Sequence, residues 1–337
     1  MSLVPDYIKK LLPYKAGKPI DEVRRELGIK DIIKLASNEN PLGPSLKAIK
    51  AIEKSIKNIS SYPDSSGFYL RKKLSNIFSL SMDNVVLGAG SEGIMATIMR
   101  TFLNDSDHIL ATENSFIGFR VLANSSGKKI DWIPMKDYAY DLDAMAKAIH
   151  ENTKIIYLAN PDNPTGSYFN KDQFDNFINK VPNRCLVILD EAYYEYASCF
   201  NDYPDSMHYR YDNVITLRTF SKAYGLAGLR AGYGFAHKDL ISNIMKVKLP
   251  FEPSVLAQAA AIAALDDREH LNRTLDENLT QGSKFKETLD ILGLKYMGVR
   301  EREPEKMFSF LTLRLCLMFD HTHALCVVFS FGTFMPL

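Results

Sequence analysis

From about residue 85 the chain alternates short apolar runs with amphipathic stretches. The apolar runs are NVVLG (84–88), HILAT (108–112), KIDWIP (129–134), KIIYLAN (154–160), CLVILD (185–190) and VITL (214–217). Between them lie segments such as SEGIMATIMRTFL, FIGFRVLANS, DLDAMAKAIH and KDQFDNFINK, several of which have helical spacing. This rhythm is typical of α/β folds, and runs without polar alternation indicate parallel strands buried on both faces.

Three polar residues follow these predicted strands, namely Asn160, Asp190 and Thr219. Ligands of open α/β sheets gather at the carboxyl ends of the strands, so these positions are the first candidates for chemistry. After about residue 237 the strand rhythm gives way to a helical stretch over 254–290. We interpret that stretch as the entry to a smaller second domain.

Charge and composition exclude several functional classes. With 41 basic and 40 acidic residues, the chain has no electrostatic footprint for nucleic acid or an anionic membrane surface. We expect no nucleic-acid partner and no membrane association, since the chain has neither an apolar leader nor a run of about 18 apolar residues. Four scattered cysteines without metal-site spacing indicate a reducing cytoplasm.

The segment LRTFSKAYGLAGLRAGYGFA (217–236) places a lysine, Lys222, among hydroxyls, an arginine and glycines. A single lysine in a loop is ordinarily a solvated surface residue. Here Ser221 and Arg230 offer a hydroxyl and a planar guanidinium suited to a phosphate, as a lysine that binds a phosphorylated cofactor covalently requires.

Two further motifs follow predicted strands. In LDEAYYEYA (189–197), Asp190 either caps the next turn or lies buried against a pyridine nitrogen of a cofactor, where it would keep that nitrogen protonated. Tyr193 could donate a hydrogen bond to the phenolic oxygen of the same ring. In NPDNPTG (160–166), the Asn-Pro steps make a plain turn or hold the amide of Asn163 toward the same oxygen.

The motif GAGSEG (88–93) follows a predicted strand and opens a predicted helix. It spells GxGxxG, so a dinucleotide site with Asp107 as the ribose-binding acid is the alternative. The pattern itself requires only one phosphate at a helix N-terminus, which pyridoxal phosphate also supplies. A dehydrogenase explains neither Lys222 nor Asp190, so we favour pyridoxal phosphate.

These segments, together with LASNENPLGPS (35–45) and YPDSSGFYLRKKL (62–74), resemble the histidinol-phosphate aminotransferase family over roughly residues 5–295. The resemblance implies the aspartate-aminotransferase fold type: a three-layer α/β/α large domain with a mostly parallel sheet (36–245), a smaller α+β domain (246–337) and an N-terminal arm (1–35). It makes Lys222 the Schiff-base residue, Asp190 the partner of the pyridine nitrogen, and Asn163 and Tyr193 the contacts of the ring hydroxyl. Its remaining cofactor contacts are Gly90, Ser91, Glu92, Phe116, Thr219, Ser221 and Arg230.

The resemblance also implies a homodimer with shared active sites, in which Tyr62 reaches the partner's cofactor phosphate. Tyr14 and Asn40, with Glu39 beside them, match positions that line the substrate side. The implied reaction moves an amino group from glutamate to the cofactor and then to a keto substrate, giving histidinol phosphate, with Lys222 moving the proton. The alternatives are an aromatic-amino-acid aminotransferase, a phosphothreonine decarboxylase, or a protein of this fold that no longer catalyses.

After about Tyr296 the resemblance stops, and the last residues do not contain the arginine strand that clamps the substrate carboxylate in the family. Arg314 is the nearest candidate. We therefore expect this chain to bind the cofactor but to transaminate poorly, and we interpret the tail as a frame-shifted or similarly altered end. His321 and His323 lie near Cys316 and Cys326, but this spacing does not indicate a metal site, and we predict none.

Overall fold

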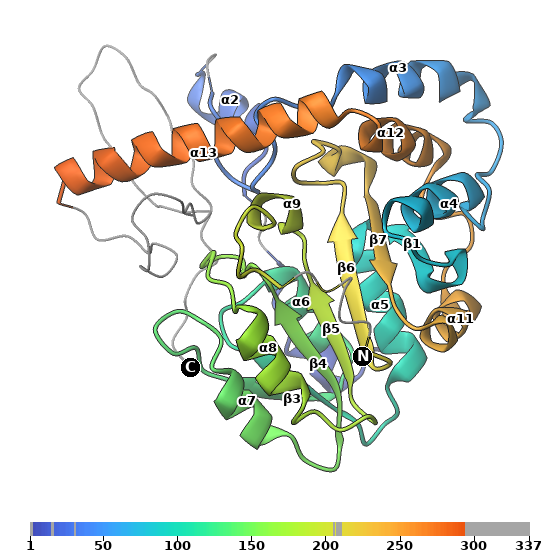
Figure 1. Ribbon diagram of the computed structural model, residues 1–337, viewed down its shortest axis with the longest axis vertical. Coiled ribbons are helices and arrows are strands. Elements are labelled where there is room, and N and C mark those ends of the chain that lie inside the picture. The colour runs from blue at the N-terminus through green and yellow to red at the C-terminus, as the bar shows by residue number, and fades with distance from the viewer. Residues whose placement is uncertain (1–2, 15–16, 30–31, 205, 207–210, 294–337) are drawn as a thin grey trace.

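A seven-stranded sheet forms the centre of the computed structural model, which describes residues 3–14, 17–29, 32–204, 206 and 211–293 (Figure 1). The strands are β1 (Val85–Ala89), β2 (His108–Thr112), β3 (Lys129–Ile133), β4 (Thr153–Ala159), β5 (Leu186–Asp190), β6 (Val214–Thr219) and β7 (Ala231–Phe235). Their order across the sheet is β1-β7-β6-β5-β4-β2-β3. The apolar runs of the sequence therefore predicted six strands correctly.

Strand β7 was not predicted, and it is the antiparallel member of the sheet. It pairs antiparallel with both β1 and β6, whereas β2, β3, β4, β5 and β6 pair in parallel. Its sequence, AGYGF, contains two glycines, which weaken any strand signal. The prediction of a mostly parallel sheet is confirmed.

Helices connect and cover these strands. Their bounds are α1 (Asp6–Lys9), α2 (Ile20–Leu27), α3 (Leu46–Ser55), α4 (Phe68–Ile77), α5 (Gly90–Phe102), α6 (Ile117–Ser125), α7 (Leu142–Ala148), α8 (Lys171–Ile178), α9 (Tyr194–Ala197), α11 (Lys238–Val247), α12 (Val255–Leu265) and α13 (Arg268–Ile291), with short 3-10 turns η1 (Ile56–Asn58), η2 (Met82–Asn84) and η3 (Ala227–Leu229).

The core consists of two apolar layers, one on each face of the sheet. On one face, α5, α6 and α11 pack against alternate residues of the strands, among them Ile155, Tyr157 and Ile188. On the other face, α3, α4 and α12 cover β1 and β7, while α7 and α8 cover β4 and β5 through residues such as Ile156 and Leu158. This three-layer arrangement explains why the central strands are apolar at nearly every position.

The helical stretch predicted for 254–290 is two helices. Ser254 caps α12 by accepting a hydrogen bond from the backbone N–H of Ala257, and Asp267 caps α13 by accepting one from the N–H of His270. Residues of α12 share the core of β1 and β7, so this helix packs directly on the sheet. The division into two domains near residue 245 stays a prediction.

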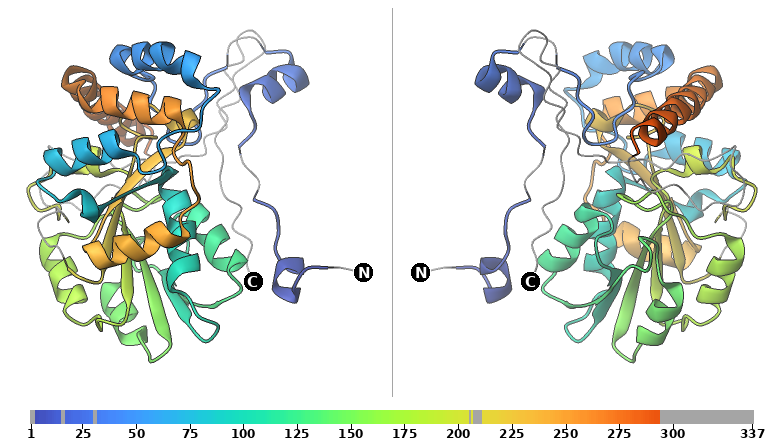
Figure 2. Two further views of the ribbon diagram at one scale, coloured as in Figure 1. Left: turned by 90° about the vertical axis from the view of Figure 1, so that its right-hand side faces the viewer. Right: turned by 90° about the vertical axis from the view of Figure 1, so that its left-hand side faces the viewer.

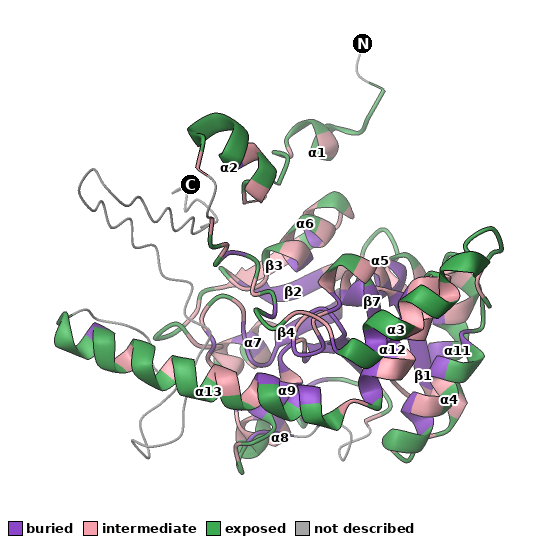
Figure 3. Cartoon of the chain, turned by 90° about the horizontal axis from the view of Figure 1, so that it is seen from above, coloured by how far each residue is buried: buried purple, intermediate pink, exposed green. Residues whose placement is uncertain are grey.

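The N-terminal segment lies along the side of the molecule (Figure 2). Helix α1 has no buried residue, α2 buries Val23 alone, and both appear largely exposed (Figure 3). The ring of Tyr7 lies close to Gly127, just after α6. None of the described helices has the length and apolar character needed to cross a membrane.

Candidate active site

Asp190 and Thr219 end neighbouring strands on the face of the sheet that α5 covers. Asp190 lies two residues after Ile188, and Thr219 two residues after Leu217, and both of those apolar residues pack in the α5 layer. Because side chains alternate along a strand, the two polar side chains point to that same layer. Asn160 differs, since its buried amide donates to the Phe169 carbonyl and accepts from the Phe169 N–H. Asn160 therefore braces a loop.

Lys222 lies in the turn after β6, with its ammonium group near both ring and carboxylate partners. Its Nζ donates to the Ser37 carbonyl at 2.8 Å and lies 5.7 Å from the centre of the Tyr193 ring. Burial lowers the pKa of the Lys222 amine, and Arg230 lowers it further, while Glu39 and Asp190 oppose this shift. A lowered pKa favours the neutral amine, which is the nucleophilic form.

The carboxyl group of Asp190 is buried and only half satisfied. The Tyr157 hydroxyl donates to Oδ2 at 2.9 Å, while Oδ1 has no hydrogen-bond partner among the described residues. Burial raises the pKa of Asp190 to about 7, although the hydrogen bond from Tyr157 and a smaller effect of the Ala192 backbone N–H oppose this change. A buried acceptor without a partner is costly, so this oxygen is suited to a donor supplied by a ligand.

A cradle of backbone groups and one guanidinium lies where β1 meets α5. Gly90, at φ +75°, begins the helix, and a methyl group on it would lie 2.7 Å from Arg230 Nη2. A Cβ on Gly232 would lie 2.4 Å from both the Gly90 carbonyl carbon and the Ser91 nitrogen, so β7 reaches this helix terminus only with glycine there. Free N–H groups at a helix N-terminus favour an anion.

Two hydroxyl groups and a charge pair surround this cradle. The Thr219 hydroxyl donates to Ser221 Oγ at 3.0 Å and accepts the Ser221 N–H. Arg230 Nη2 donates to Glu92 Oε2 at 3.1 Å. A Cβ on Gly118 would meet both Glu92 Oε1 and the Phe116 ring, which places Phe116 beside the same carboxylate.

Tyr193 is buried at the start of α9, and its hydroxyl accepts a hydrogen bond from Asn38 Nδ2 at 2.9 Å. Asn38 and the preceding Ser37 adopt positive φ, which turns the chain toward the site. Asn163 is half-buried, and no hydrogen bond joins it to Tyr193 within the described ranges. In the same turn, Asp162 accepts from Ser115 and Thr165, and burial raises its pKa to about 6.

A buried ion pair fixes the strand ends from the other face of the sheet. Arg218 donates to Glu191 Oε2 through Nε and Nη2, each at 2.8 Å, and both side chains are fully buried. The guanidinium carbon of Arg218 also lies 3.2 Å from the centre of the Tyr194 ring. Because each partner directly neighbours Thr219 or Asp190 in the chain, this pair restrains both site residues.

The other predicted residues lie in different settings. Tyr14 and Tyr62 are exposed, at 55% and 80%, and the Tyr62 ring stacks on Phe251 with centroids 4.3 Å apart. Asn40 is buried, and its amide donates to the Ala223 carbonyl and to Thr274 Oγ1. Arg314 lies outside the described residues, as do the tail and its histidines and cysteines.

Sequence reasoning missed Tyr157, Asn38, Asp162 and the Glu191–Arg218 pair. Tyr157 and Arg218 each interrupt an apolar run, and a polar group inside a buried strand must find a partner. That signal could have identified both residues. The partners themselves come from segments distant in sequence and were not predictable from local patterns.

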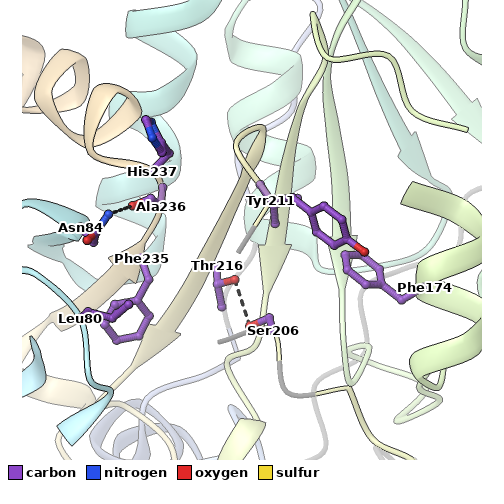
Figure 4. Close-up of a pocket in the computed structure, with 10 residues that line it drawn as sticks. Leu80, Asn84, Phe174, Ser206, Tyr211, Thr216, Phe235, Ala236 and His237 are labelled. Atoms are coloured by element: carbon purple, nitrogen blue, oxygen red, sulfur yellow. Dashed lines mark hydrogen bonds between the residues drawn. The ribbon is translucent and has the colours of Figure 1, made fainter. Parts of the chain in front are cut away.

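A cavity of about 160 Å³ lies elsewhere, between Val214 and Thr216 of β6 and the end of β7 (Figure 4). Several of its polar groups already have partners: Thr216 donates to Ser206, Asn84 to the Ala236 carbonyl and Tyr211 to Asp175. It contains none of the predicted site residues. We therefore place the chemistry at the carboxyl ends of β5 and β6.

The residues at that place fit pyridoxal phosphate. The unsatisfied Asp190 Oδ1 matches a ring N–H, and the α5 terminus with Arg230 matches a phosphate. The Lys222 amine, whose pKa is lowered by burial, is suited to attack the aldehyde carbon of the cofactor. The dinucleotide alternative assigns no role to Lys222 or Asp190.

Known proteins resemble this chain over most of its length. The family described as aminotransferase class I and II matches residues 30–314. Histidinol-phosphate aminotransferase 2 of Carboxydothermus hydrogenoformans is 41% identical over 298 residues, which are 88% of this chain and 82% of that protein. The enzyme of Moorella thermoacetica is 41% identical over 293 residues, covering 86% of this chain and 76% of that protein.

Solved structures show the same fold. Histidinol-phosphate aminotransferase from Sinorhizobium meliloti, in complex with pyridoxal-5'-phosphate, superimposes with a TM-score of 0.81 at 28% identity, covering 89% of this chain and 80% of that one. Aspartate aminotransferase from Thermus thermophilus, with maleate, has a TM-score of 0.75 at 18% identity, over 89% and 83% of the two chains, which supports the fold alone. The predicted fold type is confirmed, and the chain belongs to the aminotransferase class I and II family, within its histidinol-phosphate aminotransferase group.

Proposed function

We propose that this protein transfers an amino group between glutamate and 2-oxoglutarate on one side and histidinol phosphate and imidazole acetol phosphate on the other, with pyridoxal 5'-phosphate as cofactor. This reaction belongs to histidine biosynthesis. The observation that carries the proposal is the meeting of Lys222, the half-satisfied Asp190 and the α5 N-terminus at one edge of the sheet. The similarity to relatives named for this reaction supports the choice of substrates.

Asp190 sets the electronic state of the bound cofactor. When bound, the pyridine ring of the cofactor withdraws electrons from the substrate α-carbon. Asp190 Oδ1 accepts the ring N–H and, as a carboxylate, favours the protonated ring. Tyr157 holds the other carboxylate oxygen, and Tyr193 and Asn163 contact the ring hydroxyl in our proposal.

Lys222 is the residue that would hold the cofactor covalently. With its amine free, Nζ would serve as the base that takes the proton from the substrate α-carbon. Burial lowers the pKa of the Lys222 amine, which favours the neutral form that a base requires. The Ser37 carbonyl accepts a hydrogen bond from Nζ at 2.8 Å, which restrains the position of the amine.

The phosphate group binds at the start of α5. The N–H groups of Gly90, Ser91 and Glu92 would hold it, together with the hydroxyls of Thr219 and Ser221 and the guanidinium of Arg230. Because the Glu92 carboxylate pairs with Arg230 in this structure, we propose that the phosphate competes for Arg230. Phe116, beside Glu92, stacks on the cofactor ring.

On the substrate side we propose three residues, Tyr14, Asn40 and Arg314. Tyr14 and Arg314 remain predicted contacts of the substrate. The Asn40 amide donates to the carbonyl of Ala223, the residue after Lys222, and to Thr274 Oγ1. We propose a homodimer in the cytoplasm, in which Tyr62 serves the partner's site. Its support is that Tyr62 is 80% exposed in the single chain.

The test begins with an absorbance spectrum of the purified protein, which should show a visible band from the lysine–cofactor linkage. Lys222→Ala should abolish the band and the borohydride-reducible adduct, whereas Lys248→Ala, which alters another lysine of lowered pKa, should retain both. Stopped-flow bleaching by glutamate and by histidinol phosphate then tests the substrates. A response to aromatic amino acids but not histidinol phosphate would instead support an aromatic-amino-acid aminotransferase.

A further inference from the structure

Two histidines and an aspartate meet at the far side of the sheet from Lys222. His108 opens β2, Asp131 lies within the edge strand β3, and His150 lies in the connection from α7 to β4. Asp131 Oδ2 lies 3.1 Å from His108 Nδ1 and 2.9 Å from His150 Nε2. One potential ligand atom from each residue lies within 4.8 Å of the other two.

This arrangement matches the donor set of a borderline transition metal. Imidazole nitrogens and a carboxylate oxygen bind Zn²⁺ at about 2.0–2.2 Å, and tetrahedral geometry then places two donors about 3.3 Å apart. Both carboxylate–imidazole distances are close to that separation. The three side chains are 14%, 32% and 38% exposed, so water can provide a fourth ligand.

The histidine rings are already oriented toward one point. Their centroids lie 4.6 Å apart at an interplanar angle of 85°, with one nitrogen of each ring facing the same oxygen. The Asn152 N–H donates to His150 Nδ1 at 3.2 Å, which leaves Nε2 as the ring nitrogen that faces Asp131.

We propose that His108, Asp131 and His150 form a structural site for a divalent transition metal ion of the Zn²⁺ type. The ion would join the edge strand β3 to β2 and to the loop before β4, three segments that are separate in sequence. It would stabilise the folded chain because the unfolded chain does not hold these ligands together. The site lies at the amino end of β2, whereas the proposed active site lies at the carboxyl ends of β5 and β6.

The test is a titration of the chelator-treated, cofactor-loaded protein with Zn²⁺ by calorimetry and with Co²⁺ by visible absorption. We expect one ion per chain at this site, Co²⁺ bands of four-coordinate geometry, and a higher Tm in the presence of Zn²⁺. His150→Gln and Asp131→Asn should each weaken this binding at least tenfold and abolish the Tm shift. Both substitutions keep a polar side chain at a partly exposed position.

The matched control is His237→Gln, which changes another partly exposed histidine that lies beside a carboxylate, Asp239, at 3.5 Å. This variant should bind Zn²⁺ like the wild type. Absence of binding to the wild type would overturn the proposal. Binding that persists unchanged in both His150→Gln and Asp131→Asn would overturn it too, because the ion would then occupy other ligands.

Discussion

Tyr157 and Asp190, on the adjacent strands β4 and β5, are joined by a hydrogen bond of 2.9 Å from the tyrosine hydroxyl to Oδ2. The Tyr157 ring itself stacks on Phe119, with centroids 3.7 Å apart. This double restraint fixes the direction of the carboxyl group, and it leaves Oδ1 as the acceptor for a ligand. The charge of Asp190 at neutral pH therefore depends on a residue that does not itself need to touch the cofactor.

Tyr157→Phe should make cofactor binding more sensitive to acid. Loss of the hydroxyl removes a hydrogen bond that lowers the pKa of Asp190, so the pKa rises and the carboxylate is lost at higher pH. We expect the acid limb of the affinity profile to move upward by about one pH unit. Cofactor dissociation constants measured between pH 5.5 and 8.5 provide the check.

Tyr233→Phe is the matched control for this change. Its hydroxyl is also buried, has no hydrogen-bond partner among the described residues, and lies in the apolar layer on the other face of the sheet. It should leave the pH profile of cofactor affinity unchanged. Equal profiles for Tyr157→Phe and the wild type would show that Tyr157 does not tune Asp190.

Asp190→Asn should raise the stability of the protein while it lowers the activity. In the cofactor-free protein the pKa of Asp190 is raised from 3.8 to about 7, so folding disfavours the charged form. The native state then binds more protons than the unfolded state between these values, and stability falls as pH rises from about 4 to 7. The amide variant lacks this loss, so its advantage in urea unfolding should grow over that window and then level off.

The same variant should lose about a hundredfold or more in turnover, because a neutral amide does not stabilise the protonated ring. Its cofactor should still bind through the phosphate and Lys222. Near-normal turnover of Asp190→Asn would contradict the role proposed for this carboxylate. A stability difference from the wild type that is independent of pH would contradict the assignment of the raised pKa.

Gly232→Ala should weaken the phosphate cradle. The added Cβ would lie 2.4 Å from backbone atoms of Gly90 and Ser91, so either β7 or the α5 terminus must move. We expect a loss of about 1–3 kcal/mol in the free energy of unfolding and a larger dissociation constant for pyridoxal phosphate. Gly228→Ala, which meets no atom within 4 Å in the same segment, should change neither quantity. Equal cofactor affinity in the two variants would exclude the proposed close approach as a requirement.

Mixing subunits should reveal a shared site if the protein is a homodimer. Tyr62→Phe and Lys222→Ala should each impair activity, but in a mixed dimer one site combines an intact lysine with an intact Tyr62 from the partner. Activity should therefore rise after the two variants are unfolded together and refolded. Gel filtration of each parent and refolding of each alone are the controls, and a mixture no more active than its parents would refute shared sites.

The strands and the cofactor motifs were predictable because their signals are local. The run that ends at Asp190 is apolar at every earlier position, and Val214, Ile215 and Leu217 precede Thr219. A strand that is buried on both faces has such a pattern, which few other structures share. Lys222, Ser221 and Arg230 lie within one segment, so their association required no knowledge of the tertiary structure. The proximity of GAGSEG to that segment, through β7, was not predictable from strand patterns, since Gly232 and Gly234 conceal the strand.

The residues that sequence reasoning missed act through distant partners. Asn38 meets Tyr193 only because Ser37 and Asn38 take positive φ, a conformation that their side chains allow but do not require. His108, Asp131 and His150 come together through the register of β2, β3 and β4. Spacing along the chain carries no information about such a group.

The reversal of direction at β7 has an evolutionary consequence. Thr219 and Gly232 are paired across β6 and β7, so the segment between them leaves the sheet and returns to the same place. Lys222 and Arg230 are therefore encoded within one short stretch of the gene and can be inherited together.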